Sequence, residues 1–193
     1  RPGASLAALL WLTTTAAPVC ADGPGAFPPP PKPSLPATIS EQDAIDAYNQ
    51  GYAAIQRADH SQALAEASAG PENRDAERAA RASYQESLRH FAEAIRLDGA
   101  MHEAYTYLGY ANGKLGHHAK ALDAYEQALR IHPDYPHAIE YQGQAFLGLN
   151  RLAEARFNYL RLYALNKGQA AKLLAAMRTW GVSNQNTELE GVD

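Results

Sequence analysis

The chain has 193 residues, 46% of them hydrophobic and 20% charged, and a formal net charge of −4. These values are typical of a soluble globular protein with enough apolar material for a core. The length leaves room for one ordinary domain plus appendages. A mildly acidic chain lacks the positive field that binding to a phosphate backbone requires, so we expect no nucleic-acid partner.

Residues 1–21 have the composition of a signal peptide. Residues 6–17 form an uncharged, largely apolar run. This run is too short for a transmembrane helix, which needs about 20 apolar residues. It is followed by Val19-Cys20-Ala21, with small or β-branched residues where a signal peptidase needs them. We therefore expect cleavage near Ala21 and a mature protein that is periplasmic or secreted, of the exported bacterial type, without a transmembrane segment.

Cys20 is the single cysteine of the chain and leaves one alternative open. Bacterial lipoproteins are acylated on a cysteine that follows a small residue, whereas Pro18 and Val19 precede Cys20. The favoured prediction is that Cys20 leaves with the signal peptide, and the alternative is a lipoprotein anchored through Cys20. In the favoured case the mature chain has no disulfide and no cysteine-based metal site.

Residues 22–39 are predicted to be a proline-rich linker. Seven prolines lie between Pro24 and Pro36. Proline removes backbone donors and biases the chain towards the extended polyproline II form, which makes a semi-rigid spacer. The PxxP spacing also allows a ligand for a proline-recognising domain, but a spacer is the favoured interpretation.

From Ser40, a predicted helix cap, to about residue 182 the apolar residues recur at helical spacing, and nothing alternates as in a strand. The prediction is an all-α domain over residues 40–182. Within it, residues 102–135 align with residues 136–169 at a period of 34. The aligned pairs are Tyr105 with Ile139, Gly109 with Gly143, Ala121 with Ala155, and Tyr125 with Tyr159.

This pattern resembles the tetratricopeptide repeat family, whose repeat has Leu-Gly, aromatic, Ala and Pro residues at fixed offsets. Residues 102–135 carry the pattern through Tyr105, Leu108-Gly109, Ala121, Tyr125, Ala128 and Pro133. The departures are Asn112 in this copy and Gln142, Leu162 and Lys167 in the next. The resemblance implies a solenoid of about three helical hairpins. Gly109 and Ala121 are expected where two helices approach closely, and Gly116 and Gly148 are expected at the turns.

The hairpins are predicted at about residues 41–101, 102–135 and 136–167, followed by a capping helix over 168–182 and a disordered tail over 183–193. The first hairpin has 24 extra residues, because Gly51 lies 58 residues before Gly109. It could turn at Asp59-His60, or its helices could be elongated and turn at Gly70-Pro71. The second arrangement is favoured, because Gly70-Pro71 is a strong helix breaker.

In this family the first helix of each hairpin lines a concave groove that binds peptides, which implies a set of groove residues here. They are Tyr48, Asn49, Tyr52, Gln56, Thr106, Tyr107, Tyr110, Lys114, His137, Tyr141 and Gln144. Tyrosine is enriched in binding surfaces because it combines a large apolar ring with a hydroxyl group. The alternative is that some of these rings pack between hairpins. Tyrosine and histidine stand where carboxylate-clamping members carry Lys, Asn and Arg, so no such clamp is expected.

No catalytic motif is present, and the chain is predicted not to be an enzyme and to need no cofactor. His117 and His118 lie at a turn, and His132 and His137 lie across a helix break, so we expect no metal site. The predicted function is that of an adaptor or scaffold that binds another protein in a tyrosine-rich groove. The alternative is a self-associating structural module that forms a homo-oligomer, and a metal-dependent enzyme is a distant third.

Overall fold

The computed structural model describes residues 39–67 and 71–189, so the predicted signal peptide, Cys20 and all but the last residue of the predicted linker lie outside the described residues. The described part is helical, as the sequence predicted, and contains no strand. Its helices are α1 (Ile39–Ala67), α2 (Pro71–Leu97), α3 (His102–Lys114), α4 (His118–Ile131), α5 (Pro136–Gly148), α6 (Leu152–Leu165) and α7 (Lys167–Leu189).

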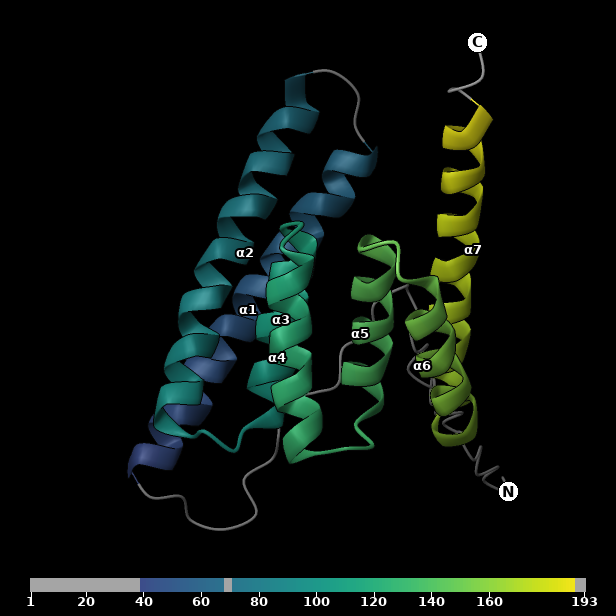
Figure 1. The fold of residues 1–193 in the computed structure, drawn as a ribbon. Helices are drawn as coiled ribbons and strands as arrows, with labels where there is room; N and C mark the ends of the chain where they lie inside the picture. The colour runs from purple at the N-terminus through teal and green to yellow at the C-terminus, as the bar shows by residue number, and fades with distance from the viewer. Residues whose placement is uncertain (1–38, 68–70, 190–193) are drawn as a thin grey trace, which may run out of the picture.

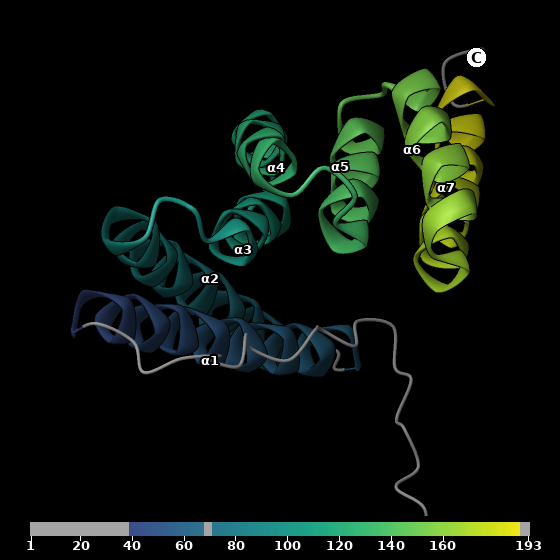
Figure 2. The same ribbon diagram turned by 90° about the horizontal axis from the view of Figure 1, so that it is seen from below.

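Successive hairpins stack on one another in chain order (Figure 1). The pairs α1–α2, α3–α4 and α5–α6 form hairpins, and each hairpin packs on the next through α2 against α3 and α4 against α5. Helix α7 packs against both α5 and α6 and ends the stack. Seen along the helices, the stack curves, with α1, α3, α5 and α7 towards its inner side and α2, α4 and α6 towards its outer side (Figure 2).

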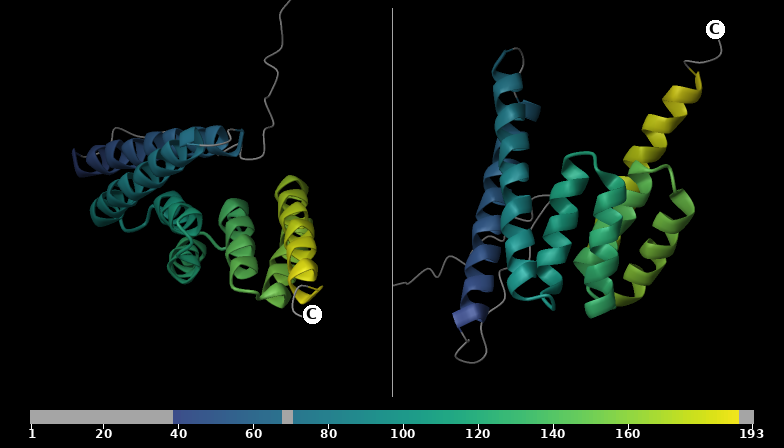
Figure 3. Two further views of the ribbon diagram at one scale, coloured as in Figure 1. Left: turned by 90° about the horizontal axis from the view of Figure 1, so that it is seen from above. Right: turned by 60° about the vertical axis from the view of Figure 1, so that its left-hand side comes forward.

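The first hairpin is longer than the others. Helices α1 and α2 have 29 and 27 residues, whereas α3 has 13. Asp59 and His60 lie inside α1, so the chain does not turn there, and α2 begins at Pro71, a residue that fits the first turn of a helix. The two long helices project beyond the ends of α3 and α4 (Figure 3).

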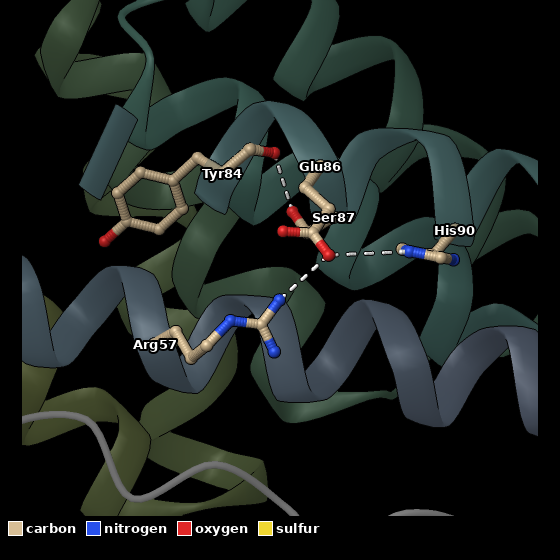
Figure 4. Close-up of polar contacts among 5 residues, drawn as sticks. All are labelled: Arg57, Tyr84, Glu86, Ser87 and His90. Carbon is tan, nitrogen blue, oxygen red and sulfur yellow. Dashed lines mark hydrogen bonds and ion pairs between the residues drawn. The ribbon is translucent and has the colours of Figure 1, made fainter. Parts of the chain in front are cut away.

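An ion pair joins α1 to α2, and two further polar contacts lie beside it within α2 (Figure 4). A guanidinium nitrogen of Arg57 in α1 lies 2.9 Å from Oε1 of Glu86 in α2, and Nε2 of His90 lies 3.8 Å from the same oxygen. The buried hydroxyl of Ser87 donates to the backbone carbonyl of Tyr84 at 2.8 Å. Partly exposed ion pairs of this kind contribute only about 0–1 kcal/mol each, so burial of apolar groups supplies most of the stability.

Close helix crossings depend on glycine. A Cβ atom on Gly51 would lie 2.8 Å from the ring of Phe91, and one on Gly109 would lie 2.4 Å from the ring of Tyr125. Both crossings join the two helices of one hairpin. The sequence predicted this role for Gly109, and the missing side chain is what lets each ring lie against the facing backbone.

The turn of the second hairpin uses the predicted Gly116, whereas the turn of the third uses a different residue from the predicted Gly148. Gly116 has a φ of +81°, a left-handed conformation that suits glycine. Gly148 is the last residue of α5, and the left-handed residue of the third hairpin is Asn150, with a φ of 59°. Asn150 is 34 residues after Gly116 and therefore occupies the same repeat position. Gly148 instead allows close approach, because a Cβ there would lie 2.6 Å from the ring of His118.

Two predicted boundaries were wrong. Ser40 lies within α1, which begins at Ile39, so Ser40 does not cap the helix from outside. Helix α7 runs to Leu189, seven residues beyond the predicted end of the capping helix at residue 182, where a disordered tail was expected. Residues 183–188 are polar, but residues 183–189 contain neither glycine nor proline, so the backbone continues the helix.

Candidate functional site

The five tyrosines predicted to line the groove form one row across α1, α3 and α5. Ring centroids are 5.9 Å apart for Tyr48 and Tyr107, and 5.5 Å apart for Tyr52 and Tyr107. The row continues at 6.5 Å from Tyr107 to Tyr110 and at 5.1 Å from Tyr110 to Tyr141. The helical spacing within α1 and α3 and the 34-residue period between α3 and α5 bring these rings together.

Much of this row is core. Tyr48 and Tyr107 are 0% exposed and Tyr141 is 8% exposed, and Phe91 of α2 stacks on Tyr107 at 5.7 Å. Burial raises the pKa of each of these three phenols well above its ordinary value, so they stay neutral. Only Tyr52 and Tyr110 are half-buried. The row therefore forms the base of the inner surface and also holds the inner helices together.

The remaining predicted residues differ in their exposure. Asn49, Gln56, Lys114 and Gln144 are exposed. Thr106 is buried, and its hydroxyl donates to the carbonyl of His102 at 2.8 Å, so it serves its own helix.

His137 is half-buried between two tyrosines. Its ring centroid lies 5.4 Å from that of Tyr135 and 6.4 Å from that of Tyr141. Burial, aided by the charge of Lys172, lowers the pKa of His137 to about 4. The imidazole is therefore neutral at physiological pH and sits within the aromatic row as an uncharged ring.

A cavity of about 150 Å³ opens between α3 and α5, where the aromatic row meets solvent. Tyr125 of α4 is buried beneath it, and Nζ of Lys114 lies 5.4 Å from the ring centroid of Tyr110 at its edge. The lining residues are Tyr110, Gly113, Lys114, His118, Tyr125, Tyr141, Gln144 and Ala145. A benzene-sized group occupies about this volume, so one side chain of a ligand fits here.

Asp59 links three helices beside this cavity. Its carboxylate accepts hydrogen bonds from the hydroxyls of Tyr84 in α2 and Tyr110 in α3, the latter at 3.0 Å. The Tyr84 hydroxyl also lies 2.9 Å from Oε1 of Gln62. Burial raises the pKa of Asp59, while the two hydroxyl donors and the charge of Lys114 oppose that rise. The sequence offered Asp59 only as part of a possible turn, so its role as an acceptor was not predicted.

A larger recess of about 500 Å³ lies where the long first hairpin extends past α3. It is lined by Gln62, Ala65, Glu66, Asn73, Glu77, Arg78, Ala80, Arg81, Tyr84, Lys114 and Leu115. Lys114 borders both this recess and the cavity between α3 and α5. The elongated hairpin therefore extends the candidate surface beyond the positions that the repeat pattern predicted.

Glu140 is a titratable group that the sequence did not single out. It is 2% exposed, and the amide nitrogen of Gln144 donates to its carboxylate. Burial raises its pKa to about 7, against the opposing effects of the Gln144 hydrogen bond and the Lys172 charge. A glutamate in a helical repeat is normally a solvated surface residue, so only the packing of α7 against α5 reveals its burial.

The histidines considered for a metal site have other surroundings. His132 stacks on His102 at a centroid distance of 4.8 Å, His117 is exposed, and His118 lies against Gly148. In residues 39–67 and 71–189, no group of three or more His, Cys, Asp or Glu side chains is placed to hold a metal ion. A membrane-crossing helix, which must be long and apolar, does not occur in these ranges either.

These features define a solenoid of helical hairpins with an aromatic inner surface, a class that includes many proteins that bind other polypeptides. The chain contains a tetratricopeptide repeat. Residues 102–135, which are α3, α4 and the turn that follows, match the family profile described as "Tetratricopeptide repeat".

Similar proteins include two with co-chaperone names. The chain is 32% identical over 77 residues to an Hsp70-Hsp90 organising protein of Plasmodium falciparum, a match that covers 40% of the chain and 31% of that protein. It is 29% identical over 115 residues to the "Tetratricopeptide repeat and J domain-containing co-chaperone DNJ1" of Cryptococcus neoformans var. grubii, covering 59% and 22%. The chain thus spans less than a third of the length of these relatives.

Solved structures share the fold at low sequence identity. The first tetratricopeptide domain of Spaghetti (RPAP3), bound to the HSP90 peptide SRMEEVD, has a TM-score of 0.55 and 17% identity, covering 73% of this chain and 95% of that one. The tetratricopeptide domain of Arabidopsis OM64 has a TM-score of 0.50 and 16% identity, covering 71% and 98%. At these identities the likeness establishes the fold alone.

Proposed function

We propose that this chain is a non-enzymatic adaptor that binds a segment of another polypeptide along its inner surface. The observation that carries the proposal is the cavity of about 150 Å³ between α3 and α5. Its walls are the rings of Tyr110, Tyr125 and Tyr141, and two polar side chains, Lys114 and Gln144, stand at its edge. An apolar recess with a few polar groups is the arrangement that anchors one ligand side chain and orients the segment around it.

The base of this surface is already formed before a ligand binds. Tyr48 and Tyr107 are fixed in the core by Phe91, and Tyr110 is held by Asp59. A preformed surface loses little conformational entropy on binding, so most of the ordering cost falls on the ligand. The amide of Gln144 and the ammonium of Lys114 at the edge of the cavity supply hydrogen-bond donors for the backbone carbonyls of an extended segment.

The ligand that fits best is neutral, with an aromatic or aliphatic anchor. The related domain of RPAP3 is bound to SRMEEVD, a peptide with three acidic side chains. Here Lys114 is the one cation among the predicted groove residues, and the half-buried carboxyl group of Asp59 and the buried one of Glu140 lie beside the same surface. Binding of a strongly acidic terminus requires several cations, so we expect such peptides to bind this chain poorly.

The proposed site of action is the cell envelope. This part of the proposal is supported by residues 1–21, whose apolar run and following small residues are typical of an export signal. Fractionation of cells that carry the chain with a C-terminal tag, with mass spectrometry of its N-terminus, tests it. A new N-terminus near Ala21 in the periplasmic fraction is expected, and an uncleaved cytoplasmic chain would contradict it.

The test of the adaptor function is capture of partners from envelope extract. Replacing Tyr107 is unsuitable because this core ring is 0% exposed, so the variant should change exposed positions, one from each inner helix. Gln56→Ala/Lys114→Ala/Gln144→Ala meets this requirement. The matched control Arg89→Ala/Asp123→Ala/Glu126→Ala changes exposed residues of the outer helices.

We expect both variants to keep the helical circular dichroism of the parent chain, and only the inner variant to lose captured proteins. Equal capture by both variants would contradict binding at the inner surface. Capture of the chain alone, from either variant, would favour the homo-oligomeric module instead.

A further inference from the structure

Helices α6 and α7 frame a second apolar groove at the C-terminal end of the stack, separate from the inner surface. Its volume is about 440 Å³. The lining residues are Leu152, Arg156, Leu174, Met177, Arg178, Trp180, Gly181 and Asn184. Leu152, Leu174, Met177 and Trp180 are only half-buried, so a line of large apolar groups faces solvent. Apolar surface of this kind, edged by polar groups, commonly marks an interaction site.

Helix α7 has no hairpin partner among the described residues. Each of α1, α3 and α5 pairs with the helix that follows it, and α7 packs on α5 and α6 as α5 packs on α3 and α4. Helix α7 therefore stands where the first helix of a further hairpin would stand (Figure 3). The groove lies on the side of α7 that borders α6.

The repeat period shows that the adjoining face of α6 is also uncovered. In α4, Leu122 is 7% exposed and Leu129 packs against the core. The residues 34 positions later, Arg156 and Tyr163, are both exposed. The same stripe of the outer helix is thus covered in the second hairpin and open in the third.

Apolar residues of α6 extend the groove outward. Phe157 is 67% exposed and Leu160 is 66% exposed. The equivalent residues of α4, 34 positions earlier, are Asp123 and Glu126, which are ordinary solvated side chains. The third hairpin therefore has large apolar residues where the second has charged ones. Single exposed apolar residues are common on protein surfaces, but that does not explain this exchange at two equivalent positions.

The surroundings of the groove are basic. Residues 151–184 contain six Lys and Arg residues (151, 156, 161, 167, 172 and 178) and one acidic residue, Glu154. Ion pairs engage Arg151 with Glu154 and Arg161 with Asp134. Arg156 and Arg178 line the groove itself and are exposed. A partner for this surface must therefore combine an apolar face with negative charge.

We propose that this α6–α7 groove binds an amphipathic helix of another protein that carries Asp or Glu residues beside its apolar face. The apolar side chains of that helix cover Leu174, Met177 and Trp180, and its carboxylates pair with Arg156 and Arg178. Recognition of this kind is a helix-in-groove contact anchored at i, i+3, i+4 and i+7. An adaptor with this surface has a second docking site besides its inner surface.

A second copy of the chain fits the groove less well. Symmetric pairing of two such ends would bring the Arg156 and Arg178 side chains of the two copies together, and like charges repel. Head-to-tail pairing would place the first hairpin on the groove. Leu64 is the one exposed large hydrophobic residue of α1 and α2 in their described part, so that hairpin has no apolar face to fill it.

The test uses two fluorescent synthetic helices with the same leucine spacing, one with Glu beside the apolar face and one with Lys there. Fluorescence anisotropy with the full chain should show the Glu peptide binding at least tenfold more tightly than the Lys peptide. Arg156→Glu/Arg178→Glu should reverse that preference. Arg89→Glu/Arg130→Glu, which changes exposed arginines on α2 and α4, should leave it unchanged.

Met177→Ser should weaken binding of the Glu peptide at least fivefold while Gln56→Ala/Lys114→Ala/Gln144→Ala leaves it unchanged. Equal binding of both peptides, or no effect of the charge reversal, would overturn the proposal. A dimer of the parent chain that dissociates in Met177→Ser would assign the groove to a second copy. Cosedimentation with phosphatidylglycerol vesicles, lost in the charge-reversal variant and without peptide binding, would assign it to a membrane surface.

Discussion

The second and third hairpins follow the same 34-residue pattern but are packed differently. In the second hairpin, Gly109 faces the ring of Tyr125 from the same hairpin. In the third, Gly143 faces the end of Leu173 from α7, and Tyr159, the equivalent of Tyr125, is only partly buried. A buried polar side chain, Asn158, instead crosses to α5 and donates to the carbonyl of Ile139 at 3.1 Å.

This difference shows what a repeat pattern determines. The small residues at fixed offsets place the helices and their crossings in both hairpins. What fills each crossing differs: at Gly109 it is a ring of the same hairpin, and at Gly143 it is a side chain of α7, the last helix of the described part. Equivalent positions can therefore be core in one repeat and surface in the next, as Leu122 and Arg156 are.

The sharpest test of the comparison is truncation of the equivalent tyrosines. Tyr125→Ala removes a ring that is 2% exposed and should lower the free energy of unfolding by about 3–5 kcal/mol. Tyr159→Ala removes a partly exposed ring and should cost about 1–2 kcal/mol. Urea unfolding followed by circular dichroism measures both, and equal losses would mean that the two hairpins are packed alike.

A pH effect is expected from the third hairpin. Glu140 occupies the repeat position of Thr106, and burial raises its pKa from 4.5 to about 7. A raised pKa means that the folded state favours the protonated form, so its stabilising contribution is complete below about pH 4.5 and is lost as the pH rises through about 7. The full shift corresponds to about 3 kcal/mol.

Glu140→Gln should therefore remove most of the stability difference between pH 5.5 and pH 8, measured by urea unfolding at both values. His137, with a pKa lowered to about 4, acts in the opposite direction: its contribution is complete above about pH 6.5 and is lost as the pH falls through about 4. An unchanged pH profile in Glu140→Gln would show that Glu140 is solvated. Thr106→Ser serves as the control without a titratable group.

Replacing the equivalent glycines by alanine should affect stability differently in the two hairpins. In Gly109→Ala the new Cβ meets the rigid Tyr125 ring at 2.4 Å, and overpacking should outweigh the better helix propensity by about 1–2 kcal/mol. In Gly143→Ala it meets the flexible end of Leu173, so the two effects should nearly cancel. Thermal unfolding of both variants provides the measurement, and a greater loss for Gly143→Ala would reverse the comparison.

The smallest effect is expected where the third hairpin differs most at its surface. Phe157→Asp restores the residue that the second hairpin has at this position, Asp123. Because Phe157 is 67% exposed, the free energy of unfolding should change by no more than about 0.5 kcal/mol. A loss of several kcal/mol would show that Phe157 is covered within the chain and does not face solvent.

Most of the fold could be predicted from the sequence because it depends on local signals. Gly109, Tyr125 and Pro133 mark a helix crossing and a helix end through their own size and backbone chemistry, and the 34-residue period repeats them. The extent of α7 could not be predicted, since polar composition suggested disorder whereas the absence of glycine and proline allowed the helix to continue. Gly148 was misjudged because its need for a small side chain arises from His118, which is 30 residues away.

The candidate site was predicted only in part. Helical spacing correctly brought five tyrosines into one row but could not distinguish Tyr107, which is 0% exposed, from the half-buried Tyr110. Asp59 and Glu140 were missed because each appears in the sequence as an ordinary acidic residue, and only contacts between helices reveal its partners. Whether the row binds a polypeptide is a question for the capture experiment.

The carboxylate of Asp59 has a mechanical consequence. Hydrogen bonds from Tyr84 and Tyr110 tie α1, α2 and α3 at one point, and α1 continues about 12 Å beyond it to Ala67. A force applied at the tip of the long hairpin therefore reaches α3 through a rigid arm and is not dissipated at a hinge. Tyr110 also lines the cavity between α3 and α5. A force on that arm therefore acts on the shape of this cavity.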